Sequence, residues 1–326
     1  MSKKKFVTIT LNPSLDRTLV THYLAVGYQN RTPEPERLDP AGQGVNVARA
    51  LHQLECETHA IIVLGDDATG RAYQALIADE GFEATIINVN GQTRTNTVIL
   101  DTGNHQETQI TTEGAQITEA DVQQVIKALQ RIVAMGDVVI YAGSLPNGAS
   151  VETYARLIEI GHAAGAEVAL ATGGLALGEA LKAQPELVAV GQIECEAFFN
   201  YPIRVLEDVI TFGHKLRAQG AGKALVEMRE AGSAVLVTEE GEWKTGLPDV
   251  TQGTSIGIWE AMLAGFLAGH AKRKPLKESL ELGAAAAAYT GAEIGIEFGS
   301  LTEAREYRAD VDVTSVDESK EGQAKE

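Results

Sequence analysis

The stretch "GTSIGIWEAMLAGFLAG", residues 253–269, contains the residue types and spacing best suited to chemistry. Its first half is typical of a turn before a helix, where backbone amides can bind an anion. Glu260 begins the small-residue helix and has a carboxylate that can act as a general base. Trp259, however, puts an indole where close approach to a ligand favours glycine. The stretch is therefore either an active site or an altered remnant of one.

A second glycine-rich turn, "AGQG" at residues 41–44, precedes "GVNVARALHQL", in which apolar residues recur at helical spacing. Gly42 and Gly44 allow backbone amides to approach a ligand, and the N-terminus of the following helix favours an anion or a hydroxyl oxygen. Asn46, on the first helical turn, can both donate to and accept from hydroxyl groups. We therefore predict a second ligand-binding turn here.

Strands and helices must alternate to position these turns. Apolar strand patterns such as "KFVTITLNP", "HAIIVLG" and "GDVVIYAGSLP" are followed by helical patterns, which predicts an α/β protein with a parallel sheet covered by helices on both faces. Two non-helical segments, about 17–39 and 88–112, interrupt this order, and the second alternates polar and apolar residues around "TGN". We expect them to form a small antiparallel sheet. One domain over residues 1–313 and a polar tail over 314–326 are predicted.

Composition excludes several classes of partner. The chain has 326 residues and a formal net charge of −18 without a basic stripe, which argues against nucleic acid and anionic membrane surfaces. No apolar run reaches the ~20 residues of a membrane helix, and the N-terminus lacks the apolar region of a signal peptide. Cys56 and Cys195 form no CxxC and have no histidine cluster beside them. A cytoplasmic protein with reduced thiols and no metal-ligand cluster is expected.

The order and spacing of "TLNPSLDRT", "GYQNR", "PAGQGVNVARAL", "TRTN", "AGSLPNG" and "AGFLAG" resemble the PfkB (ribokinase-like) carbohydrate kinases. The resemblance extends from about Lys5 to Val313 and is strongest to the branch that phosphorylates fructose 1-phosphate, fructose 6-phosphate or tagatose 6-phosphate. It implies a ribokinase-like three-layer α/β/α Rossmann-like domain with a small antiparallel β-sheet lid, and a homodimer formed through that lid. It also implies ATP and Mg²⁺ as cofactors and a sugar phosphate as acceptor.

The resemblance assigns an acceptor-binding role to several residues besides Gly42, Gly44 and Asn46. Asp16, expected at the end of the first strand, would accept hydrogen bonds from sugar hydroxyls. Arg94 in "TRTN" would bind the phosphate of the acceptor, and Arg31 would assist from the other lid segment. Ser144 in "GSLP" would lie near the acceptor. The alternatives are a turn cap for Asp16, solvated arginines, and a turn residue for Ser144.

The donor side departs from the family pattern. The family's Gly-Ala-Gly-Asp turn aligns with residues 257–260, in which Gly257 remains as part of an anion hole and Glu260 replaces the Asp as base. Trp259 replaces the second Gly and would obstruct the backbone amides. Only Glu196 survives from the family's Lys-Pro-Asn-x-x-Glu, at "GQIECE".

Two further donor-side stretches are altered. Glu227 and Arg229 replace small residues of a family strand, and Ala171 replaces the Asp of a "DTSG"-like turn. Three hypotheses follow. The first is a degenerate kinase that binds a sugar phosphate but transfers phosphate poorly, the second is an active kinase that uses Glu260 as base, and the third is an interaction protein that binds no sugar. We rank them in that order.

Overall fold

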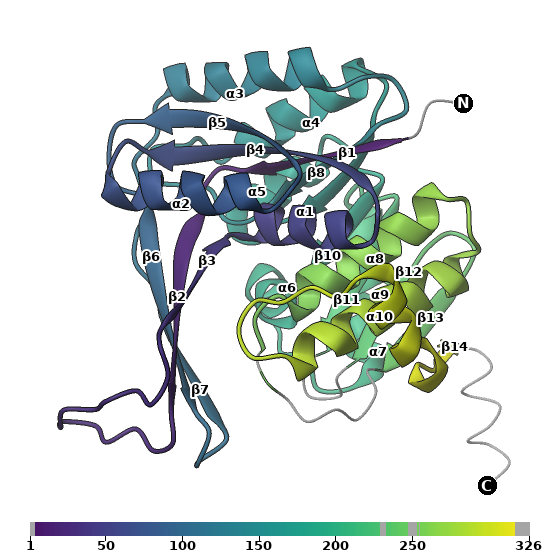
Figure 1. The fold of residues 1–326 in the computed structure, drawn as a ribbon. Helices are drawn as coiled ribbons and strands as arrows, with labels where there is room; N and C mark the ends of the chain where they lie inside the picture. Colours follow the sequence, from purple (N-terminus) through teal and green to yellow (C-terminus); the bar gives the residue numbers. More distant parts are fainter. Residues whose placement is uncertain (1–3, 229–232, 247–252, 254, 317–326) are drawn as a thin grey trace, which may run out of the picture.

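A ten-stranded sheet forms the centre of the molecule (Figure 1). The computed structural model describes residues 4–228, 233–246, 253 and 255–316. The strands, in the order in which they lie side by side, are β14 (Val313–Ser315), β13 (Glu242–Gly246), β12 (Ser233–Val237), β11 (Lys223–Met228), β10 (Leu187–Val190), β9 (Glu167–Ala171), β8 (Val138–Ala142), β1 (Lys5–Thr10), β4 (Glu57–Gly65) and β5 (Glu83–Val89).

The predicted parallel sheet is correct for the strands from β5 to β11, all of which pair in parallel. It is wrong for the other edge, where β11 to β14 pair antiparallel. For β11, β12 and β13 the reason is the length of the connections. Only four residues separate each of these strands from the next, which suffices for hairpins, whereas parallel neighbours need a crossover of a dozen or more residues.

Helices cover both faces of this sheet, as predicted. One face carries α3 (Glu119–Ile132), α4 (Thr153–Ala163), α5 (Gly174–Leu181), α6 (Gln192–Phe199) and α7 (Leu206–Ala218). The other face carries α1 (Gln43–Gln53), α2 (Ala68–Asp79), α8 (Ile258–Ala271), α9 (Leu276–Ala292) and α10 (Leu301–Tyr307), which continues into the short helix η2 (Arg308–Asp310). The three-layer arrangement follows because the parallel strands bury apolar side chains on both faces.

Helices α8 and α9 pack closely because both contain small residues. A Cβ added at Gly265 of α8 would lie 2.7 Å from the Cα of Gly283 in α9, which is closer than two carbon atoms pack. The same close approach recurs one turn later, where a Cβ on Gly269 would lie 2.8 Å from the Cα of Ser279. The glycines of "AGFLAG" therefore serve the fold, and they fix the position of the N-terminus of α8.

The two interrupting segments form a separate four-stranded sheet, the lid, which extends from the body as an arm (Figure 1). Its strands, in spatial order, are β3 (Arg37–Ala41), β2 (Ser14–Thr21), β6 (Arg94–Asp101) and β7 (Gln106–Ile110). The lid is mixed and not purely antiparallel, because β2 and β6 pair in parallel. These two strands belong to segments far apart in the chain, so no hairpin forces them to run in opposite directions.

The predicted tail begins too early. Residues of β14 pair with β13, and the side chains of Val313 and Val316 are buried. A strand of three residues is too short for its alternation to be recognised among acidic neighbours. The folded part therefore continues at least to Val316, and the remaining tail residues, 317–326, lie outside the described ranges.

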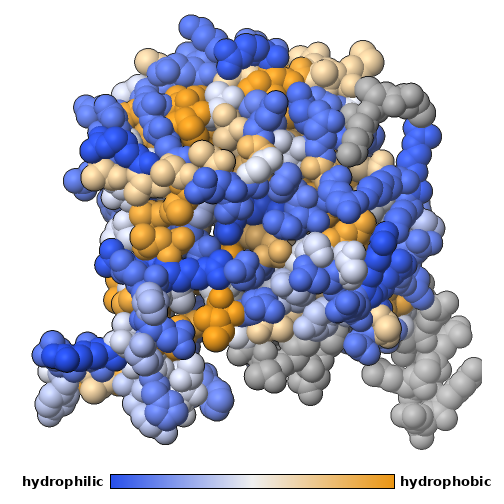
Figure 2. Space-filling view, in the orientation of Figure 1, coloured by the Kyte–Doolittle hydropathy of each residue, from blue (hydrophilic) through white to orange (hydrophobic). Residues whose placement is uncertain are grey.

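The exposed face in Figure 2 is mostly hydrophilic, and its apolar residues lie in separate small groups. This distribution agrees with the large negative net charge. Across the described ranges, none of the helices combines the length and apolar character needed to cross a membrane.

Candidate active site

A cavity of about 760 Å³ opens where the carboxyl ends of the central strands meet the lid. After β1 the chain forms β4 and β5 on one side of it and later returns to form β8 on the other. Ligands of open α/β sheets bind at such a switch point, outside the carboxyl ends of the strands. The volume lies in the range of small-molecule sites. The cavity is therefore the candidate active site.

Asp16 lies in the cavity wall and is almost fully buried, with 3% of its surface exposed. It belongs to lid strand β2 and not to the end of β1, so its predicted element was wrong, although it does line the cavity. Asn96 of β6 donates a hydrogen bond from Nδ2 to Asp16 Oδ1 at 2.9 Å. Burial raises the pKa of Asp16, while hydrogen bonds from Ser14 and Asn96 and the charge of Arg94 lower it in part.

The "AGQG" turn has the predicted form. Gly42 is the N-cap of α1 with φ 121°, a conformation that favours glycine. A Cβ on Gly44 would lie 2.8 Å from the carbonyl oxygen of Ile9, so this helix start lies directly against β1. Asn46 lines the cavity, is buried, and has an Oδ1 atom without a hydrogen-bond partner in the described part of the chain. A ligand hydroxyl can supply the missing donor.

Arg94 and Ser144 also line the cavity, as predicted. Arg94 lies at the start of β6, and its Nη2 and Nε atoms donate to the carbonyl oxygen of Asn12 at 3.0 and 3.2 Å. Ser144 follows β8 and accepts a hydrogen bond from Asn12 Nδ2 at 3.1 Å. Asn12 therefore connects the two residues and fixes the guanidinium group at the cavity wall.

Arg31 and Glu196 are not among the residues that line this cavity. Arg31 is exposed on the lid loop between β2 and β3. Glu196 accepts hydrogen bonds from Gln192 Nε2 at 2.9 Å and from the amide of Ile203 at 2.8 Å, and these bonds lower its pKa. Glu196 thus fixes the loop after α6 in this structure, while Glu194 of the same helix lines the cavity.

The "GIWE" turn forms the start of α8. Gly257 is its N-cap with φ 86°, and its carbonyl accepts the first helical hydrogen bond, from Ala261, at 2.9 Å. Trp259 belongs to the helix and is absent from the residues with positive φ. The expectation that position 259 needs the conformational freedom of glycine is therefore wrong. The amides can point along the helix axis as in any N-terminus, and the remaining effect of Trp259 is the volume of its indole in the cavity wall.

Glu260 lies on the first turn of α8 and lines the same cavity as Asp16 and Asn46. Its pKa is raised to about 7, mainly by burial and in smaller part by the charges of Glu227, Glu194 and Asp16. A carboxyl group that titrates near neutral pH is suited to general acid–base catalysis. The Glu260 side chain therefore places a carboxylate in the wall of this cavity.

Carboxylates dominate the donor side. The Glu227 side chain accepts from the amide of Gln192 at 3.4 Å at the start of α6, and Glu194 lines the cavity nearby. Ala171 lines the cavity too, whereas Arg229 lies outside the described residues.

The helix N-terminus at Gly257 fits a phosphate group. Glu194 can serve as one of the one or two carboxylate contacts that Mg²⁺ usually makes when it arrives with a nucleotide. Within the described ranges no three or more His, Cys, Asp or Glu side chains are grouped to hold a metal by themselves.

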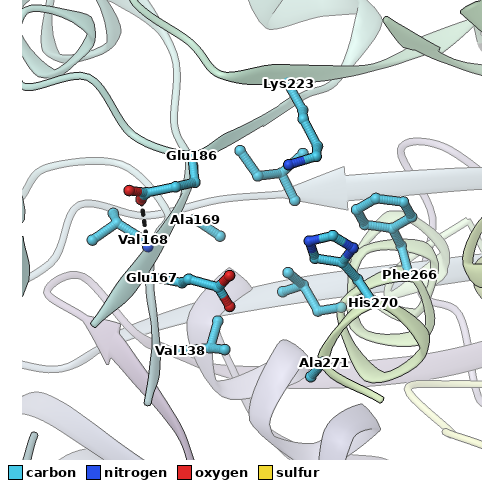
Figure 3. A pocket seen from close by; sticks show the side chains of 11 residues that line it. Val138, Glu167, Val168, Ala169, Glu186, Lys223, Phe266, His270 and Ala271 are labelled. Atoms are coloured by element: carbon cyan, nitrogen blue, oxygen red, sulfur yellow. Dashed lines mark hydrogen bonds between the residues drawn. The ribbon is translucent and has the colours of Figure 1, made fainter. Parts of the chain in front are cut away.

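A second cavity lies at the opposite end of the sheet, where the amino ends of β8 to β11 meet the end of α8. Figure 3 shows Glu167, Glu186, Lys223 and His270 around it, with His270 beside Phe266. Its volume is about 50 Å³, which holds a water molecule or two but no sugar phosphate. It is therefore excluded as the site of the main reaction.

Several polar residues of the larger cavity were not predicted from sequence, among them three at the base of the lid. Asn12, Ser14 and Asn96 all line it, and Asn96 Oδ1 is buried without a hydrogen-bond partner among the described residues. Asn12 and Ser14 lie within the quoted "LNPSLD", and Asn96 within "TRTN". These motifs therefore contained the residues, but Asn and Ser are also common in turns. Only the fold shows that these three side chains line a cavity.

A family profile, curated relatives and solved structures all show similarity between this chain and carbohydrate kinases. The sequence profile of the pfkB family carbohydrate kinases matches residues 10–301. The 1-phosphofructokinase of Bacillus subtilis is 32% identical over 292 residues, which is 89% of this chain and 94% of the relative. That of Rhodobacter capsulatus is 34% identical over 298 residues, covering 89% and 92% respectively. The structure of phosphofructokinase-2 from Escherichia coli in complex with substrates and products superposes with a TM-score of 0.86 at 25% identity, covering 94% of this chain and 98% of that one.

Proposed function

Because the chain belongs to the pfkB family of carbohydrate kinases, we propose that it transfers a phosphoryl group from ATP to a phosphorylated hexose, and fructose 1-phosphate is the first acceptor to test. One observation carries this proposal. A single cavity is lined by polar groups suited to a sugar phosphate and by Glu260 at the N-terminus of α8. The names of the curated relatives support the choice of acceptor. We therefore rank the hypothesis of an active kinase above that of a degenerate kinase, whereas the sequence alone favoured the degenerate kinase.

The acceptor is held by the residues at the base of the lid. The Asp16 carboxylate, oriented by Asn96, accepts hydrogen bonds from sugar hydroxyls. The side-chain amides of Asn46 and Asn96 each have a buried Oδ1 atom without a hydrogen-bond partner among the described residues, and hydroxyl donors of the sugar satisfy both. Arg94 pairs with the phosphate that the sugar already carries.

Transfer then needs a base and charge stabilisation. Glu260 takes the proton of the attacking hydroxyl, and its pKa of about 7 allows it to do so near neutral pH. The amides at the N-terminus of α8 stabilise the negative charge of the transferring group. ATP with Mg²⁺ supplies the phosphoryl group and neutralises part of its charge.

A second candidate function is sugar-phosphate binding with little or no transfer. Two observations favour it: the Trp259 indole lies in the cavity wall, and Glu194 and Glu227 add negative charge close to Glu260. Negative charge on the donor side disfavours the binding of phosphates. The acceptor half is the same under both candidates, so nucleotide binding and turnover distinguish them.

The lid is proposed to mediate a homodimer. Its outward face carries a row of paired positions, Leu38, Arg17, Thr97 and Ile110, one from each strand. Ile110 is 55% exposed and Leu38 is 37% exposed, and apolar side chains on an exposed sheet face favour burial against a second copy. Light scattering of wild type and Ile110→Arg tests this, since the substituted chain is expected to be monomeric.

The kinase proposal is tested by ATP consumption with fructose 1-phosphate, fructose 6-phosphate and tagatose 6-phosphate in the presence of Mg²⁺. Wild type is expected to turn over at least one of them, and Glu260→Gln is expected to lose at least about 100-fold in kcat because the base is gone. Glu159→Gln, which removes an exposed helical carboxylate on α4, is the matched control and should keep full activity.

Calorimetry separates the remaining outcomes. Saturable binding of a sugar phosphate without turnover, with wild type and Glu260→Gln equally silent, would establish the second candidate. If the chain bound neither a sugar phosphate nor ATP, both candidate functions would be overturned. The third hypothesis, an interaction protein that binds no sugar, would then remain. Turnover unaffected by Glu260→Gln would refute the assignment of the base while leaving the kinase activity in place.

A further inference from the structure

One side chain of the lid binds directly to the segment that precedes the anion-binding turn. The Glu107 carboxylate, on edge strand β7, accepts a hydrogen bond from the amide of Ser255 at 2.8 Å and another from Ser255 Oγ at 2.6 Å. Ser255 lies two residues before Gly257, the N-cap of α8. Both hydrogen bonds are made to a charged acceptor, which makes them shorter and stronger than neutral ones.

The geometry of β7 explains why Glu107 faces the body of the protein. Successive side chains of a strand point to opposite faces, and Glu107 and Gln109 pair with the buried residues Leu100 and Val98 of β6. Gln109, on the same face, and Thr111, which directly follows the strand, line the cavity. One face of this strand therefore contributes to the cavity wall and holds the segment before the catalytic turn.

We propose that Glu107 is a positioning residue, which fixes the anion-binding turn of α8 through Ser255 and couples that turn to the lid. Because Gln109 lies on the same face of β7 and Thr111 directly follows the strand, a ligand that orders this part of the lid also strengthens the hydrogen bonds between Glu107 and Ser255. Conversely, when the turn at the start of α8 is fixed, it favours the position of the lid in this structure. The first half of this proposal depends only on the contact itself, whereas the coupling to a ligand rests on the proposed function.

The other edge of the lid has its own attachment. Arg37 of β3 pairs with Asp39 at 2.7 Å, donates to Glu297 at 2.7 Å and donates to the carbonyl of Ile296 at 3.0 Å. This attachment is to residues of the segment after α9 and does not involve Ser255. Loss of Glu107 therefore releases one edge of the lid and leaves the other edge attached, so the Glu107 variants are expected to remain folded.

The ligand-free test is hydrogen exchange of residues 255–261 in Glu107→Ala and Ser255→Ala. Glu107→Ala removes both hydrogen bonds, and Ser255→Ala removes the one from Oγ. We therefore expect exchange of these amides to become at least about 10-fold faster in Glu107→Ala and to increase less in Ser255→Ala. Ser255→Thr, which keeps both donors, should restore slow exchange. Glu34→Ala, which removes an exposed lid carboxylate, is the control and should leave exchange unchanged. Unaltered exchange in both Ala variants would overturn the proposal.

Trp259 supplies a spectroscopic readout that a general loss of stability would not produce. In a Trp243→Phe background it is the remaining tryptophan of the chain. Glu107→Ala removes both hydrogen bonds and should shift its emission more than Ser255→Ala, which removes only the bond from Oγ. The double variant should shift it no further than Glu107→Ala, because the contact is already lost. Additive shifts, or a lowered melting temperature with an unmoved emission spectrum, would show a role in folding only.

The coupling is measured by titrating the same variants with fructose 1-phosphate. We expect its Kd to rise about 10-fold in Glu107→Ala and to stay unchanged in Glu34→Ala. If wild type binds no sugar phosphate, the proposed function fails, while the exchange experiment still decides the role of Glu107. If wild type binds and Glu107→Ala binds equally well, the coupling is refuted.

Discussion

Replacing Glu260 by Gln should change how the stability of the protein depends on pH. Burial raises the pKa of Glu260 from an ordinary value of 4.5 to about 7. Between these values the folded chain keeps a proton that the unfolded chain has lost, so the free energy of unfolding falls as pH rises. A shift of about 2.5 units at 1.36 kcal/mol per unit is about 3 kcal/mol. Wild type loses this amount on going from acid to pH above 7, whereas the Gln variant, which does not titrate, loses nothing at this position.

The assay is urea denaturation of wild type and Glu260→Gln between pH 5.5 and 8.5, well above the sequence pI of about 4.8, where solubility is lowest. At pH 5.5, about one of the 2.5 pH units over which the stability of wild type falls has already been passed. The stability advantage of the Gln variant should therefore grow by about 2 kcal/mol across this range. Glu159→Gln should follow wild type. Parallel stability profiles of wild type and Glu260→Gln would refute the raised pKa and with it the reason for regarding Glu260 as a base near neutral pH.

Three further predictions concern the cavity and the helix that supports it. Asp16→Asn should raise the Kd for fructose 1-phosphate about 10- to 100-fold by calorimetry, because the charged acceptor is lost; an unchanged Kd would show that Asp16 serves only the lid. Trp259→Ala should lower the Kd for MgATP at least about 10-fold by removing the indole from the cavity wall, and unaltered nucleotide binding would contradict a steric role. Gly265→Ala should destabilise the chain by about 1–3 kcal/mol in denaturation, because its Cβ would lie 2.7 Å from the Gly283 backbone; wild-type stability would mean that α8 and α9 can separate freely.

Most of the residues assigned to acceptor binding line the cavity, and they could be selected from sequence because they come in short, local motifs. Gly42, Gly44 and Asn46 belong to one turn and one helix start, so their spacing alone brings them together. Arg94 and Asp16 lie on strands that pair side by side in the lid, and only the family resemblance connected them. Arg31 was assigned by the same resemblance, yet it lies on an exposed loop beyond the cavity-lining residues.

The donor half was harder, because its chemistry depends on backbone conformation and environment. Sequence reasoning treated Trp259 as incompatible with an anion-binding turn, but the positive φ falls on Gly257, so Trp259 is an ordinary helical residue. It also selected Glu196 over Glu194, although the loop hydrogen bonds to Glu196 are visible only in the fold. The raised pKa of Glu260 has the same origin, since burial and neighbouring carboxylates from distant elements produce it.

The sequence by itself determined the class of fold, the two glycine turns and the kinase family, because periodicity and short motifs are local properties of the chain. The tertiary structure alone decided the antiparallel edge of the sheet, the mixed lid and the hold of Glu107 on Ser255, since each depends on which distant segments become neighbours. It also decided the meaning of "GIWE". In that turn a carboxylate remains at the cavity with a pKa near neutrality, a property that burial creates and that no residue type carries alone.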